Sequence, residues 1–173
     1  MADIVVDTCV LAEFLSQYFD VEGANQGQSQ FIRSSNLNDR IARELNRILQ
    51  GWHHGGRNNT VPENVVVISA FAFVELVRQW ESIVSARFSL EQLRLFLNDP
   101  PTWINIAPLD EDLLPSFVSI PQKVRVGTDT KPIEWADAVH AATAFSRGTG
   151  TALITSDERL SAVPNLLVIH PLE

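Results

Sequence analysis

The sequence predicts an α/β fold in which a parallel sheet is covered by helices on both faces. Apolar runs that indicate strands alternate along the chain with segments of helical spacing. Four of the five expected strands lack the polar alternation of a sheet with one face in water, which is typical of a sheet buried on both faces. The 173 residues are enough for one compact domain, and we expect a single domain over residues 1–173.

The expected strands are short and rich in β-branched residues. They cover residues 4–6, 65–68, 103–107, 152–154 and 166–169. A helical pattern follows Asp7, and further helices are expected at about 38–50, 70–85, 89–98 and 133–147. Ser89, with Gln92 three residues later, has the pattern of a capping box. Residues 119–131 are expected to be irregular.

A helical and loop insertion is expected over residues 20–63. Residues 20–35 are rich in Gly, Gln, Asn and Ser and predict a loop. The helix that begins near residue 38 is expected to break at the glycine-rich run 51–56.

Three arginines of this insertion form one stripe on the expected helix: Arg40, Arg43 and Arg47. The stretch 31–60 carries five arginines against two acids, a net charge of +3 in a chain whose net charge is −8. Such asymmetry indicates a defined anionic partner. We expect the stripe to bind RNA phosphates, and a solvated helix face is the alternative.

Composition excludes several classes of protein. Cys9 is the only cysteine, which excludes an internal disulfide and fits a reducing cytoplasm. No apolar run approaches the ~20 residues that a membrane helix needs, and the first residues lack the pattern of a signal peptide. We therefore expect a cytoplasmic protein without a membrane anchor.

Four acidic residues, distant in sequence, are expected to meet at one edge of the sheet. Asp7 follows the first strand and Asp157 the fourth, and ligands of open α/β sheets bind at the edge where parallel strands end. Glu75 and Asp137 lie in apolar helical segments, where a carboxylate is costly to bury without a partner. Gathered carboxylates need cations to stay ionised, and oxygen ligands suit Mg²⁺ or Mn²⁺.

Taken singly, each acid has a simpler explanation. The alternatives are helix caps for Asp7 and Asp157, an ion pair with Arg78 for Glu75, and a contact with His140 for Asp137.

Four stretches of the chain resemble the acidic motifs of PIN-domain nucleases. They are residues 4–8 with Asp7, 73–76 with Glu75, 135–144 with Asp137 and 153–157 with Asp157. Their order and spacing agree with that family over nearly the whole chain, apart from the insertion. The last two motifs together are fairly specific, whereas the first is weak alone. Cys9 departs from the family, in which a small polar residue is commoner there.

The resemblance implies a three-layer α/β/α sandwich with a five-stranded parallel sheet, and a Mg²⁺- or Mn²⁺-dependent endoribonuclease. Asp7 would be the central metal ligand, helped by Asp137 and Asp157, while Glu75 would hold a second metal ion or orient the water. Thr155 and Ser156 would support the site by hydrogen bonds or form the turn. The size is similar to VapC-type toxins, which implies an antitoxin partner and a homodimer.

Other readings of the acidic pattern are weaker. A receiver domain would have paired acids after the first strand and a lysine after the last, where this chain has His170. A haloacid-dehalogenase phosphatase would have a second aspartate at the position of Cys9. A non-catalytic PIN-like module that binds RNA or protein remains the main alternative. The sequence does not distinguish RNA from DNA as the substrate.

Overall fold

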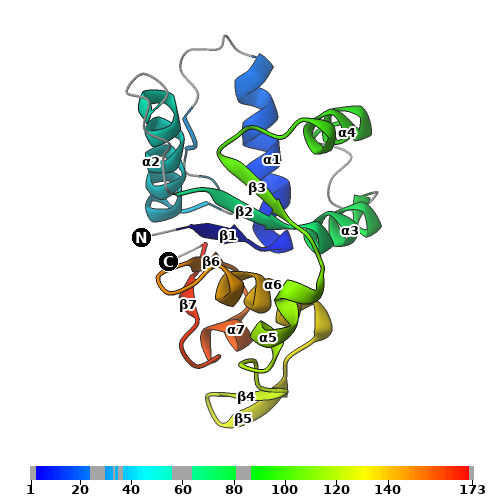
Figure 1. Cartoon of the computed structure of the whole chain (residues 1–173), viewed down its shortest axis with the longest axis vertical. Coiled ribbons are helices and arrows are strands. Elements are labelled where there is room, and N and C mark those ends of the chain that lie inside the picture. Colours follow the sequence, from blue (N-terminus) through cyan, green and yellow to red (C-terminus); the bar gives the residue numbers. More distant parts are fainter. Residues whose placement is uncertain are drawn as a thin grey trace.

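The computed structural model describes residues 3–23, 30–32, 34, 37–55, 64–80 and 87–171, with only the backbone for 20–23 and 53–55. A five-stranded sheet with the order β3-β2-β1-β6-β7 lies at its centre (Figure 1). The strands are β1 (Ile4–Val6), β2 (Val66–Ser69), β3 (Ile104–Ala107), β6 (Ala152–Ile154) and β7 (Leu167–Ile169). All their pairings are parallel, which confirms the expected sheet.

Strand β1 is the central strand, and its register sets the position of the site. Val5 pairs with Val67 of β2 on one side and with Leu153 of β6 on the other. These three side chains are fully buried in the core on one face, whereas Ile4 and Val6 are buried in the core on the opposite face. Because successive side chains of a strand point to opposite faces, a strand buried on both sides carries no polar alternation.

Helices cover both faces of the sheet. Their bounds are α1 (Thr8–Gly23), α2 (Asp39–Gly55), α3 (Ala70–Arg78), α4 (Leu90–Asn98), α5 (Leu114–Phe117), α6 (Trp135–Ser146) and α7 (Glu158–Ser161), with a 3₁₀ turn η2 at Glu111–Leu113. Buried residues of α1 to α4 pack on one face and those of α6 and α7 on the other, which makes the expected three-layer sandwich. In the described part of the chain, no helix is both long enough and apolar enough to span a membrane.

Two expectations for the insertion are wrong. Helix α1 runs on to Gly23, where a loop was expected from residue 20, and α2 passes through Gly51 to Gly55. A glycine inside a helix costs only about 1 kcal/mol. The indole N–H of Trp52 donates to the carbonyl of Asn64 at 2.8 Å, and its ring packs against the core. This anchor holds the last helical turn in place.

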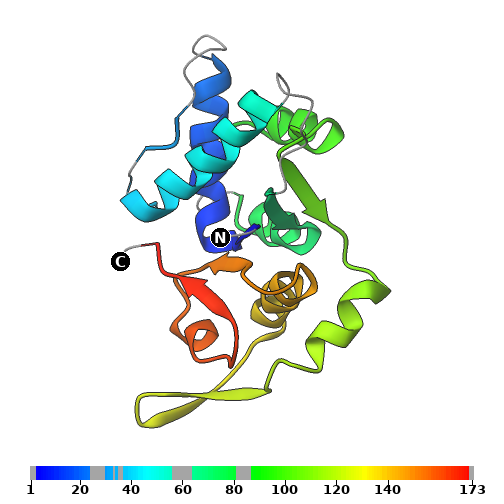
Figure 2. The ribbon, with the colours of Figure 1, turned by 60° about the vertical axis from the view of Figure 1, so that its left-hand side comes forward.

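The expectation of irregular structure at 119–131 is also wrong. Strands β4 (Lys123–Val126) and β5 (Asp129–Pro132) form an antiparallel hairpin apart from the main sheet (Figures 1 and 2). Gly127 has φ +62° at the first of the two turn positions, where hairpin turns favour glycine. Val124 is buried between two exposed basic residues, so the hairpin has one face against the body of the protein.

The core beneath α1 gives a direct test of the fold. Phe14 is fully buried, and its ring lies 5.2 Å from Phe31 and 6.1 Å from Trp103 between centroids. We expect Phe14→Ala to lower the free energy of unfolding by about 3–5 kcal/mol, measured by urea denaturation. The matched control Val118→Ala removes a side chain that is 88% exposed, and it should change stability by less than about 0.5 kcal/mol. Equal effects of the two substitutions would contradict this packing.

Candidate functional site

Asp7 lies at the carboxyl edge of the sheet, between the ends of β1 and β6. Its backbone N–H donates to the carbonyl of Ile154 at 3.1 Å, and its own carbonyl accepts from Leu11 at the start of α1. The hydroxyl of Thr155 donates to Asp7 Oδ2 at 2.5 Å. The carboxylate is therefore fixed both by its backbone and by a buried hydroxyl.

Thr155 also connects Asp7 to Asp157. Its Oγ1 accepts from the backbone N–H of Asp157 at 3.0 Å. Asp157 Oδ1 accepts from the backbone N–H of Arg159 at 2.8 Å, so Asp157 does cap α7, as the simpler explanation expected. Ser156 is exposed, and its backbone N–H donates to Cys9 Sγ at 3.3 Å. The two supporting residues thus differ: the Thr155 side chain holds the site together, and Ser156 forms the turn beside it.

Glu75 reaches the same edge from α3. Its Oε2 accepts from the hydroxyl of Thr8 at 2.6 Å and lies 3.0 Å from His140 Nε2. The same ring nitrogen is 3.3 Å from Asp7 Oδ1. His140 therefore bridges Asp7 and Glu75, whereas the sequence suggested it as a partner of Asp137. The hydrogen bonds of Glu75 come from Thr8 and His140, and Arg78 acts only through its charge.

Electrostatics support an ionised bridge between His140 and Glu75. Burial disfavours the charged imidazole, but the hydrogen bond to Glu75 and the charge of Asp7 outweigh it and raise the pKa of His140. Burial likewise opposes ionisation of Glu75, yet the hydrogen bonds from His140 and Thr8 lower the pKa of that carboxyl. Shifts in these opposite directions are those of an ion pair.

Arg159 makes a second bridge, between Asp157 and Asp137. Its guanidinium donates to both oxygens of Asp157, and its Nη2 lies 2.7 Å from Asp137 Oδ2. Its Nη1 also lies 3.1 Å from Glu134 Oε1 at the start of α6. Burial opposes ionisation of Asp157, but the hydrogen bonds from Arg159 outweigh it and lower the pKa of that carboxyl.

Asp137 is the least satisfied acid of the group. Its Oδ2 is buried and accepts no hydrogen bond within the described residues, because Arg159 is close to it but poorly aligned for one. Burial and the charges of Asp157 and Asp7 raise the pKa of Asp137 to about 6, although Arg159 opposes the shift. This oxygen therefore has Arg159 as an ion-pair partner but no donor directed at it.

The four predicted acids therefore form two bridged pairs, one on His140 and one on Arg159. Thr155 and the charge effect of Asp7 on Asp137 link the pairs. As they stand, no three His, Cys, Asp or Glu side chains of the described chain form a set that could hold a metal ion. The donor chemistry nevertheless fits Mg²⁺ or Mn²⁺, because in the described chain the four carboxylates share ion-pair contacts with only two basic side chains, of which Arg159 also contacts Glu134, and Asp137 Oδ2 accepts no hydrogen bond.

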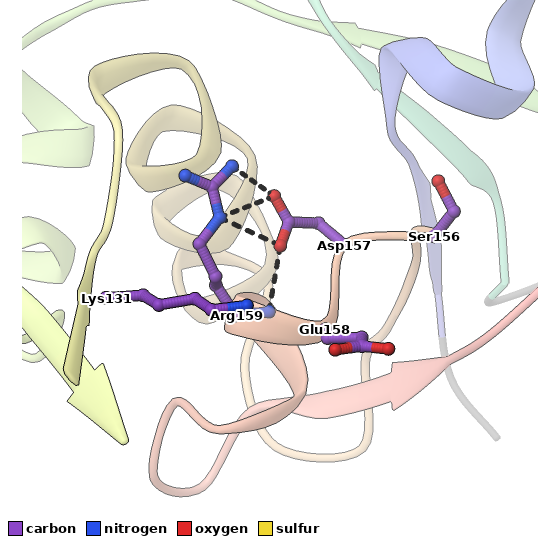
Figure 3. A pocket seen from close by; sticks show the side chains of 5 residues that line it. All are labelled: Lys131, Ser156, Asp157, Glu158 and Arg159. Atoms are coloured by element: carbon purple, nitrogen blue, oxygen red, sulfur yellow. Dashed lines mark hydrogen bonds and ion pairs between the residues drawn. The ribbon is translucent and has the colours of Figure 1, made fainter. Parts of the chain in front are cut away.

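An open pocket of about 520 Å³ adjoins the Arg159 bridge. Figure 3 shows its lining, in which the Lys131 side chain extends from β5 toward Arg159 and Asp157 lies on the other side of the guanidinium. Ser156 and Glu158 complete the wall. The pocket is large enough for a small polar group next to the acids.

The arginine stripe lies on another part of the molecule. Arg40, Arg43 and Arg47 are exposed on α2, as expected, and Arg47 pairs with Glu44 at 2.8 Å. In Figure 1, α2 is separated by α1 from α3, the helix that carries Glu75. Binding of RNA phosphates by this stripe stays a prediction.

Sequence reasoning missed three residues of the site: Thr8, Arg159 and Lys131. Thr8 directly follows Asp7 and could have been found as a polar residue at the strand end. Arg159 follows Asp157 by two residues, a spacing typical of a local cap, so only the backbone shows that it also reaches Asp137. Lys131 could have been found from the alternation and turn glycine of the hairpin.

The raised pKa of Asp137 predicts a specific pH dependence of stability. The folded protein binds more protons than the unfolded chain between the ordinary pKa of 3.8 and the folded value of about 6. Stability from this residue is therefore present below 3.8 and lost as the pH rises through about 6. We expect Asp137→Asn, in a chelator, to raise the melting temperature relative to wild type at pH 7 but not near pH 4. The same difference at both pH values would contradict burial of the Asp137 charge.

Comparison with solved structures finds seven similar chains, three of which follow. VapBC2 from Rickettsia felis bound to a DNA fragment from their promoter is 13% identical, with 97% of this chain and 98% of that chain covered and a TM-score of 0.50. FitAB bound to an IR36 DNA fragment is 20% identical, with 98% and 96% covered and a TM-score of 0.52. FitAcB from Neisseria gonorrhoeae is 20% identical, with 97% of each chain covered and a TM-score of 0.53. At these identities the likeness shows a shared fold.

A comparison with curated proteins finds no match. Among protein families, the PIN domain matches residues 28–166, a range that contains Glu75, Asp137 and Asp157 and begins after Asp7. The match covers most of the chain. The chain belongs to the PIN domain family.

Proposed function

We propose that this protein is a metal-dependent endoribonuclease that hydrolyses RNA phosphodiesters. PIN domains are generally nucleases, which supports hydrolysis of a nucleic acid. The observation that carries the proposal is the buried, unsatisfied Oδ2 of Asp137, close to the charges of Asp7 and Asp157. A structural role does not require this concentration of negative charge, whereas a cation site does.

Asp7, Glu75, Asp137 and Asp157 would hold Mg²⁺ or Mn²⁺. When bound, such an ion lowers the pKa of a coordinated water and neutralises the charge that develops on the phosphate. Carboxylates are the ligands that these hard cations prefer.

The remaining residues position the acids. Thr155 fixes the orientation of Asp7 through its 2.5 Å hydrogen bond, and His140 holds Asp7 and Glu75 together. Because a ligand held by other side chains loses little freedom on binding, these contacts prepare the site for a cation. Ser156 would support the turn that brings Asp157 to the edge.

We further propose that the protein is the toxin of a type II toxin–antitoxin pair. The similar VapBC and FitAB structures are toxin–antitoxin complexes, two of them with DNA. On this proposal the chain acts in the cytoplasm as a homodimer, and an antitoxin protein holds it inactive. RNA would be its substrate, and Arg40, Arg43 and Arg47 would hold RNA phosphates away from the reacting bond.

A non-catalytic PIN-like module that binds RNA or protein is the second candidate. The two internal bridges favour it, because His140 and Arg159 already offset part of the charge of the four acids without a metal ion. Such a module would bind RNA equally well in Mn²⁺ or EDTA and would leave it intact.

Cleavage of RNA tests the enzymatic proposal directly. We expect the wild-type protein with Mn²⁺ to cut structured or single-stranded RNA, and EDTA to abolish the reaction. Asp7→Asn should reduce the rate by at least about 100-fold because it removes a proposed metal ligand. The control Glu111→Gln changes an exposed acid of η2 and should keep full activity. Intact RNA with wild-type protein would favour the non-catalytic module, and cleavage of DNA alone would correct the substrate.

Expression in bacteria tests the toxin proposal. Induction of the wild-type chain should arrest growth, because an unrestrained ribonuclease depletes cellular RNA. Asp7→Asn should restore growth at an equal protein level, measured by culture density and immunoblot. Arrest by both proteins would show toxicity that does not depend on the acids, and normal growth with an active wild-type enzyme would contradict the toxin role.

A further inference from the structure

Beside the acidic site lies an exposed aromatic pair. Trp135 begins α6, two residues before Asp137, and its ring stacks on that of Phe117 from α5. The centroids are 5.4 Å apart, and the ring planes differ by only 4°. Trp135 is nevertheless 62% exposed, so one face of the indole is covered by Phe117 and the other is open.

Such an exposure is unusual for a tryptophan on the surface of a monomeric protein, because burial of this side chain is strongly favourable. Phe117 supports the ring in one orientation, which reduces the entropy that a ligand must overcome to bind it. A flat, supported and open indole is suited to another planar group.

The segment that leads into Trp135 is attached to the acidic site. The carbonyl of Pro132 accepts from Arg159 Nη1 at 3.4 Å, and Glu134 Oε1 lies 3.1 Å from the same nitrogen. Arg159 in turn binds Asp137 and Asp157. Residues 132–134 therefore fix Trp135 close to the acids that would hold the metal ion.

Lys131 stands at the other end of this segment. It lines the pocket next to Asp157 and Arg159 (Figure 3). Lys131 is paired across the hairpin with Val124, whose side chain is buried, so both point to the face of the hairpin that packs on the body. Arg125 lies on the opposite face of β4.

We infer that Trp135 and Lys131 form a nucleotide-binding platform for the RNA substrate, with an unpaired base on the open face of Trp135 and a backbone phosphate at Lys131. This inference rests on the proposed nuclease function and adds where the strand binds. Single-stranded RNA is the occupant that the chemistry favours, because it presents planar bases and phosphates within a few ångströms of each other. Leu114 and Val118 of the same segment are also exposed and would suit a protein partner, but such a partner has no requirement for the cation of Lys131 next to the pocket.

Binding of a short fluorescein-labelled single-stranded RNA, in EDTA to prevent cleavage, tests the platform. Trp135→Ala should weaken the affinity by about 5- to 150-fold, whereas Trp135→Phe, which keeps an aromatic face, should lose much less. With an RNA of the same length that lacks its bases, Trp135→Ala should have no effect. Lys131→Ala should weaken the binding of both RNAs and reduce the salt dependence of log Kd by the amount expected for about one phosphate contact. The matched control is Arg125→Ala, which removes a basic side chain from the opposite face of the hairpin.

Kinetics and oligomeric state complete the test. With Mn²⁺ present, Trp135→Ala should raise KM more than it lowers kcat, since Trp135 does not touch the reacting atoms. Unchanged RNA affinity in Trp135→Ala, with wild-type cleavage intact, would overturn the platform and leave the nuclease proposal standing. Absence of cleavage by the wild type would instead overturn the nuclease proposal. A shift of Trp135→Ala to a smaller species in size-exclusion chromatography would assign the tryptophan to a protein interface and also overturn the platform.

Discussion

The repulsion among four carboxylates at one edge of the sheet is the constraint on which the site depends. Parallel strands β1 and β6 end side by side and bring Asp7 and Asp157 together, while α3 and α6 add Glu75 and Asp137. Like charges in a partly buried place destabilise the fold unless cations offset them. His140 and Arg159 each bridge two of the acids, and burial together with the remaining repulsion raises the pKa of Asp137 to about 6.

These two cations divide the site into halves with different properties. His140 is buried and held by Asp7 and Glu75, so that half is rigid. Arg159 lies on the four-residue helix α7, and its side chain is partly exposed. We therefore expect a metal ion and Arg159 to compete for the same carboxylate oxygens. Arg159 would then be free to contact the RNA strand that the platform holds.

Much of the fold could be predicted from the sequence because four of the five strands lack polar alternation and Asp7 and Asp157 lie just after the ends of two of them. Two parallel strands that end in Asp7 and Asp157 must share an edge, and a carboxylate in the apolar stretch around Asp137 needs a partner. The hairpin was missed because its strands are exposed and polar. The partners of the acids were missed because side-chain bridges such as Arg159 with Asp137 join residues across elements, and hydrophobic periodicity has no signal for them. The continuation of α2 through Gly51 depends on the Trp52 anchor, which is a tertiary contact.

The central claim is that these acids form a cation site rather than a self-neutralised cluster. Crystals of the wild-type protein grown with Mn²⁺, with diffraction data collected at the manganese absorption edge, test it most directly. We expect an anomalous peak within bonding distance of Asp7 and Asp137, with Arg159 turned away from Asp137. No peak at millimolar Mn²⁺, with both bridges intact, would contradict it.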